Sequence, residues 1–82
     1  MSEDSVNVVI DYINGRLEHL KKRKTYEIYR IKNADLPIDC AYIAEHANTL
    51  QSTVARIREL EEVLKVIRTL QETEQADAEK SN

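Results

Sequence analysis

The chain is poor in the residues that make turns. Its 82 residues include one glycine and one proline, whereas a fold of many strands needs turn residues after each strand. This scarcity disfavours an all-β fold. Charged residues make up 33% of the chain and hydrophobic residues 41%, a balance that suits long helices with one apolar side.

Aromatic residues and cysteine are also scarce, which limits what can stabilise a single copy. There is no phenylalanine or tryptophan, and the four aromatic residues are all tyrosines, so the rings that usually fill a core are missing. Cys40 is the only cysteine, so no disulfide can form within one chain. Because a chain this short buries only a small core, we expect association between copies to add stability.

Catalytic and cofactor-binding motifs are missing as well. A single glycine excludes the glycine-rich loops that bind nucleotide phosphates. His19 and His46 belong to no zinc-binding motif, and Cys40 lies six residues from His46, on a different side of a helix. We therefore expect no metal, no cofactor and no catalytic residue, and the sequence predicts that the protein is not an enzyme.

Targeting signals are not evident at the start of the sequence. The first residues, MSEDSVNVV, lack the basic region and apolar region of a signal peptide. No apolar run approaches the roughly 18 residues that span a membrane. These observations predict a cytoplasmic protein without a membrane partner.

Two apolar stripes dominate the sequence. The first comprises Val6, Ile10, Ile13, Leu17 and Leu20, and the second Ile43, Ala47, Leu50, Val54, Ile57, Leu60, Leu64 and Ile67. Their steps of three and four residues are typical of helices that bury one face. The pattern breaks at residues 33–37, where Asp35 can cap a second helix that has Pro37 in its first turn.

We therefore predict an all-α fold, an antiparallel two-helix hairpin. Helix one is expected at about 4–33 and helix two at about 36–73, which together form a domain of residues 1–73. Residues 74–82 carry acidic side chains but no bulky apolar one, so we expect a disordered tail there.

Two segments of helix one are open to another interpretation. Asn14-Gly15 is a dipeptide typical of tight turns, and residues 25–31 contain aromatic and β-branched residues that also suit a strand. The apolar pattern continues through both segments, so we favour a helix at each.

A short connection between antiparallel helices sets which residues face each other. We expect facing residue numbers to sum to about 70, which opposes Val6 with Leu64, Ile10 with Leu60, Ile13 with Ile57, Leu17 with Val54 or Thr53, and Leu20 with Leu50. The same register places Lys24 opposite His46. Val63, Ile67 and Leu70 are left without partners, so we predict an oligomer interface there, in a coiled-coil-like homodimeric four-helix bundle or a larger helical oligomer.

The segment 16–32 is basic, with seven basic and two acidic residues. Together with the tyrosines near the connection it supplies our candidate partner-binding residues: Lys21, Lys22, Arg23, Tyr26, Tyr29, Arg30 and Tyr42. Such a surface suits an acidic protein partner. For the four consecutive basic residues 21–24 the sequence favours a simpler interpretation, a solvated surface, because consecutive residues point about 100° apart around a helix.

These features favour a non-enzymatic helical interaction protein that acts through protein–protein contacts, such as an oligomeric adaptor, inhibitor or assembly chaperone. Its small size and charged helices also suit an accessory factor of a phage or mobile element. The alternative is a dimeric nucleic-acid-binding regulator that uses residues 16–32. The net charge of −3 counts against that alternative, because nucleic-acid-binding domains usually carry a net positive surface.

Overall fold

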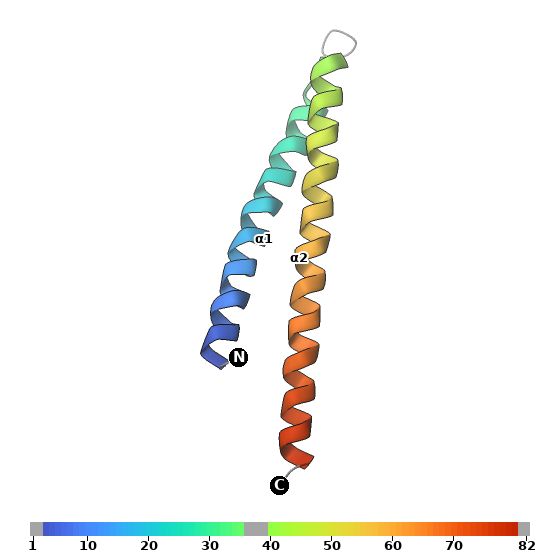
Figure 1. Ribbon diagram of the computed structural model, residues 1–82. Helices are drawn as coiled ribbons and strands as arrows, with labels where there is room; N and C mark the ends of the chain where they lie inside the picture. The colour runs from blue at the N-terminus through green and yellow to red at the C-terminus, as the bar shows by residue number, and fades with distance from the viewer. Residues whose placement is uncertain (1–2, 36–39, 81–82) are drawn as a thin grey trace.

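The computed structural model describes residues 3–35 and 40–80. It contains two helices, α1 (Glu3–Lys32) and α2 (Cys40–Lys80), which lie side by side and antiparallel in a rod of 68 × 17 × 15 Å (Figure 1). The predicted all-α hairpin is therefore confirmed. Residues 25–31 and the Asn14-Gly15 pair are helical. Across the described residues, neither helix is long and apolar enough to cross a membrane.

The core lies along the middle of the hairpin. Its buried aliphatic side chains are Ile13, Leu17, Leu20, Ile57 and Leu64, and Ile10, Leu60 and Ile67 pack against them. All eight belong to the two predicted stripes. Leu50 and Val54 are only half-buried, whereas Thr53 is buried. The Thr53 hydroxyl donates a hydrogen bond to the Thr49 carbonyl at 2.9 Å, so this polar group is satisfied within its own helix and can face the core.

The register differs from the predicted one. Glu27 of α1 is hydrogen-bonded to His46 of α2, so facing residue numbers sum to 73 at this pair rather than to 70. The prediction that Lys24 faces His46 is therefore wrong. The described helix bounds agree with this shift: α1 ends at Lys32 and α2 begins at Cys40, and these two numbers sum to 72, whereas the predicted bounds of about 33 and 36 sum to 69. Because three residues make almost one helical turn, the apolar faces still meet.

The end of α1 is closed by hydrogen bonds to its last carbonyls. The Asn33 side-chain amide and backbone N–H both donate to the Tyr29 carbonyl, at 2.8 and 3.1 Å, and the Ala34 N–H donates to the Ile31 carbonyl at 3.3 Å. These bonds supply donors to carbonyl groups that have no hydrogen-bond partner within the regular helix at its C-terminal end. The predicted place of Pro37 in the first turn of helix two lies outside the described residues.

The last turns of α2 extend past the N-terminal end of α1, as Figure 1 shows in red. We call residues 71–80 the overhang. α2 continues to Lys80, past the predicted end of helix two at about 73. The disordered tail at residues 74–82 stays a prediction. Alanine, glutamine and glutamate are strong helix formers, and the Thr73 hydroxyl donates to the Thr69 carbonyl at 2.9 Å. Residues 72–77 are all exposed, so they are helical without packing on α1.

Candidate binding surfaces

The closed end of the hairpin brings together four of the predicted partner-binding residues. Tyr26, Tyr29 and Arg30 of α1 and Tyr42 of α2 form what we call the tyrosine–arginine cluster. The Arg30 Cζ lies 5.5 Å from the ring centroids of both Tyr26 and Tyr42, within the distance at which a guanidinium is attracted to an aromatic face. Arg30 therefore links the two helices through its contacts with both rings.

A buried polar pair lies next to this cluster. Glu27 is only 4% exposed, and its Oε2 is hydrogen-bonded to the Nδ1 of His46. The His46 ring in turn packs on Tyr42, with ring centroids 4.1 Å apart and an interplanar angle of 55°. The contact between Tyr42 and His46 thus joins the buried pair to the exposed cluster and holds the Tyr42 ring in place.

Glu27 did not stand out in the sequence because it is an acidic residue within a basic segment. Its position in the sequence nonetheless indicates that it faces the core. Glu27 follows Leu20 by seven residues, or about two helical turns, so it falls on the same core-facing side as that leucine.

A shallow hollow opens beside the cluster. It has a volume of about 300 Å³ and is lined by Tyr29, Arg30, Asn33, Ala34 and Tyr42. Tyr26 and Tyr29 are exposed, whereas Tyr42 is half-buried. The closed end therefore presents aromatic rings, a guanidinium and a concave surface side by side.

The other predicted basic residues do not join this cluster. Lys21 and Lys22 are exposed, and the Lys22 Nζ lies 3.3 Å from the Glu18 Oε1, in a surface pair four residues apart. Such exposed pairs add little to stability. Arg23 lies instead in a groove farther along the hairpin. The four consecutive basic residues 21–24 therefore do not form one patch.

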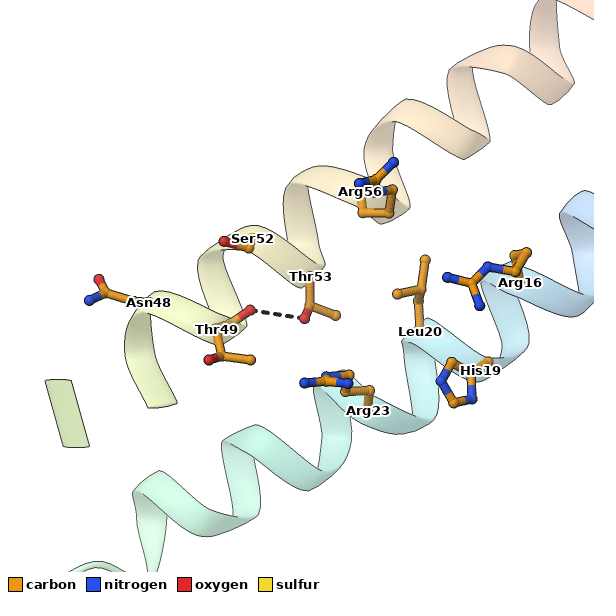
Figure 2. A pocket seen from close by; sticks show the side chains of 9 residues that line it. All are labelled: Arg16, His19, Leu20, Arg23, Asn48, Thr49, Ser52, Thr53 and Arg56. Carbon is orange, nitrogen blue, oxygen red and sulfur yellow. Dashed lines mark hydrogen bonds between the residues drawn. The ribbon is translucent and has the colours of Figure 1, made fainter. Parts of the chain in front are cut away.

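The groove that holds Arg23 lies between the helices on one side of the hairpin (Figure 2). We call it the arginine groove; its volume is about 550 Å³ and its lining residues are Arg16, His19, Leu20, Arg23, Asn48, Thr49, Ser52, Thr53 and Arg56. None of these is acidic. Within the described part of the chain, Arg16, Arg23 and Arg56 form no ion pair. The groove is thus a concentration of uncompensated positive charge.

The α1 side of this groove could have been predicted from the sequence. Arg16, His19 and Arg23 follow one another by three and four residues, the spacing of one helix side. Arg56 could not be assigned to the same site, because it comes from the other helix and its placement depends on the register.

The predicted oligomer interface divides into two parts. Val63 and Leu70 are 44% and 58% exposed, and the neighbouring Val66 is 49% exposed. Ile67 instead packs against the hairpin core, because the observed register brings it opposite Val6, within the length of α1. Exposed aliphatic side chains therefore remain along α2 after the hairpin has formed.

The thiol of Cys40 is free and exposed. Over residues 3–35 and 40–80, no group of three or more His, Cys, Asp or Glu side chains is arranged to hold a metal ion. No protein-family model, curated protein or solved structure matches this chain.

Proposed function

We propose that this chain is a non-enzymatic interaction protein that binds another protein through the tyrosine–arginine cluster. The observation that carries the proposal is the placement of Arg30 between Tyr26 and Tyr42 at an exposed end of the rod. Tyrosine and arginine are enriched among the residues that dominate binding energy at protein interfaces.

The contacts that hold Tyr42 support this proposal. The cluster stands on two helices, and Tyr42 packs on His46, which is itself bonded to the buried Glu27. Side chains that are already ordered lose less conformational entropy when a partner binds. The closed end therefore suits recognition better than a mobile loop with the same residues would.

The charge near the cluster favours a partner with an acidic surface. Lys21, Lys22 and Arg23 lie along α1 before the cluster and are exposed. Exposed charges of one sign raise the rate of encounter with an oppositely charged partner, and salt weakens this effect. An adaptor, an inhibitor and an assembly chaperone, including an accessory factor of a phage or mobile element, would all use such a surface.

The proposal can be tested by capturing partners from the native host with the tagged full chain. For a captured protein, we expect Tyr29→Ala mainly to accelerate dissociation, because it removes an exposed ring from the binding surface. A Lys21→Gln/Lys22→Gln variant should mainly slow association and reduce its salt dependence. Both rates can be measured by surface plasmon resonance.

Arg58→Gln is the matched control, because Arg58 is exposed on α2 outside both surfaces. Unchanged affinity in a folded Tyr26→Ala/Tyr29→Ala variant would refute the proposed binding surface.

We also propose that the protein self-associates, at least as a homodimer. Val63, Val66 and Leu70 support this, since a second copy would remove these aliphatic side chains from water. Sedimentation equilibrium at micromolar concentrations should detect the dimer, and its melting temperature should rise with protein concentration. A monomer with a concentration-independent melting temperature would contradict this proposal.

The alternative function is a nucleic-acid-binding regulator, and the arginine groove is the observation that favours it. Phosphate binding by Arg16, Arg23 and Arg56 would give affinity that falls steeply with salt. The net charge of −3 and the acidic overhang count against it. A gel shift with duplex and single-stranded oligonucleotides over a salt series distinguishes this alternative from the leading proposal.

A further inference from the structure

One side of α2 carries basic, apolar and acidic residues in that order. Residues seven apart are separated by about two helical turns and therefore lie on nearly the same side. Val63 and Leu70 follow Arg56 by seven and fourteen residues, and Glu74 follows it by eighteen, which is five turns. The side of α2 that borders the arginine groove thus continues into exposed aliphatic residues and then into the acidic overhang.

The matching side of α1 continues the apolar part of this surface. Val9 precedes Arg16 by seven residues, and Tyr12 precedes His19 by seven. Both are exposed, Tyr12 strongly. Because Arg16 and Arg56 line the same groove, the exposed apolar residues of α1 and α2 lie on the same face of the hairpin, next to that groove.

We infer that a second copy of this chain packs antiparallel on this face, with its acidic overhang in the arginine groove. The inference rests on the proposed self-association and specifies its geometry. An antiparallel copy reverses the order of the three regions, so its acidic end meets the basic groove while the apolar regions meet each other. Each copy then gives one overhang and receives one, as in a two-fold symmetric dimer.

The alignment can be stated in residue numbers. When Glu74 of the second copy lies opposite Arg56, facing residue numbers along the two α2 helices sum to about 130. The symmetry axis then passes at the level of Lys65. In each copy Val63 lies two residues before this level and Leu70 five residues after it, so the exposed aliphatic residues surround the axis.

The overhang has the chemistry that this groove requires. The hairpin register places Glu3, where α1 begins, opposite about residue 70, so the overhang has no α1 beside it. It carries Glu72, Glu74 and Asp77, and no basic residue before Lys80. In the inferred dimer Lys80 of the second copy reaches the level of residue 50, so the overhang covers the arginine groove but not the tyrosine–arginine cluster. The dimer thus leaves the tyrosine–arginine cluster accessible together with Lys21 and Lys22, whereas Arg23 is covered with the rest of the groove.

A second copy fits this groove better than nucleic acid does because the chain itself supplies the complementary charge in register with an apolar patch. Phosphate groups would satisfy the arginines but would leave Val63 and Leu70 exposed.

Charge reversal tests the inference in the full chain. We expect Arg56→Glu and Glu74→Arg each to raise the dimer dissociation constant by about tenfold at low salt, because each change places like charges together at two symmetric sites. The double variant Arg56→Glu/Glu74→Arg restores opposite charges and should return to within about threefold of the wild type. Sedimentation equilibrium measures all three dissociation constants.

Arg58→Glu is the matched control. It should leave the dimer dissociation constant unchanged, since Arg58 is two residues from Arg56 and points to another side of α2.

The orientation is tested with donor and acceptor dyes on Cys40, the single and exposed cysteine. In the antiparallel dimer the two Cys40 residues are about 75 Å apart along the rod, at 1.5 Å per residue, so energy transfer should be weak. A parallel dimer would bring them together at one end and give strong transfer.

Strong transfer, or a dimer that tolerates both single reversals, would overturn the inferred geometry while leaving self-association intact. A wild type that stays monomeric would overturn both proposals. An oligonucleotide that binds the wild type but not Arg56→Glu, with no change in the dimer, would assign the groove to nucleic acid instead.

Discussion

The middle of the hairpin and its closed end hold the two helices together by different means. In the middle, aliphatic side chains such as Leu17 and Ile57 are buried against each other. At the closed end, a hydrogen bond joins Glu27 to His46, and Arg30 reaches an aromatic ring on each helix. Aliphatic burial is non-directional, whereas a hydrogen bond requires particular atoms at a particular distance.

This difference separates stability from register. Sliding one helix along the other by almost one turn still brings the two apolar faces together. The aliphatic middle is therefore compatible with either register, whether facing residue numbers sum to 70 or to 73. The same slide would separate Glu27 from His46 and leave a buried carboxylate without its partner, which is costly. We therefore expect the middle to supply most of the free energy of folding and the closed end to select the alignment.

The largest expected effect comes from opening a cavity in the middle. Leu17→Ala should lower the free energy of unfolding by about 2–5 kcal/mol, because it removes buried methyl groups from a packed site. Urea unfolding at a fixed protein concentration measures the change. Val54→Ala is the control, since Val54 is only half-buried, and its cost should be smaller. A loss below about 0.5 kcal/mol for Leu17→Ala would show that the middle is not the main source of stability.

A smaller effect is expected from breaking the buried pair at the closed end. Glu27→Ala should cost about 1–3 kcal/mol, because it removes the hydrogen-bond partner of the partly buried His46. Replacing both residues in Glu27→Leu/His46→Leu should cost less than the single change, since no polar group then lacks a partner. Chemical denaturation gives both values.

Amide hydrogen exchange sharpens the comparison between stability and register. In the double leucine variant we expect faster exchange near the closed end than in the wild type, even where the global stability is retained. Unchanged exchange there would mean that the aliphatic middle alone sets the register.

Part of the stability of the middle depends on the backbone preference of a single glycine in α1. Gly15 is exposed within α1, and a Cβ atom added there meets nothing within 4 Å. Gly15→Ala should therefore raise the free energy of unfolding by about 0.8–1 kcal/mol, because glycine is a poor helix former. Thermal unfolding followed by circular dichroism measures the gain. A loss of stability would show that this turn of α1 depends on the flexibility of glycine.

The smallest expected effect is at the exposed side of the closed end. Arg30→Gln should cost about 0.5 kcal/mol, because the contacts of the guanidinium with Tyr26 and Tyr42 are close to solvent. Arg30→Lys keeps the charge but not the planar group, so its free energy of unfolding should lie between those of the wild type and Arg30→Gln. A cost comparable to that of Leu17→Ala would mean that the closed end stabilises the fold as much as the middle does.

The sequence alone predicted the helical elements and much of the closed-end cluster. The apolar steps of three and four residues predicted two helices, including residues 25–31, because this period is a local property of each helix. Tyr26, Tyr29 and Arg30 are spaced by three and one residues near the end of α1, so they were expected near the connection whatever the exact register. The C-terminal end of α2 was less predictable, because exposed helix formers continue the helix beyond the last apolar residue.

Only the tertiary structure decided which residues of one helix meet which residues of the other. A helical pattern repeats almost every turn, so matching apolar faces leaves the register undetermined in steps of about one turn. The burial of Glu27 beside His46 depends on that step, and so does the meeting of Arg56 with Arg16 and Arg23 in one groove. The sequence therefore determined the two helices and their apolar sides, whereas the contacts between the helices determined the buried pair and the arginine groove.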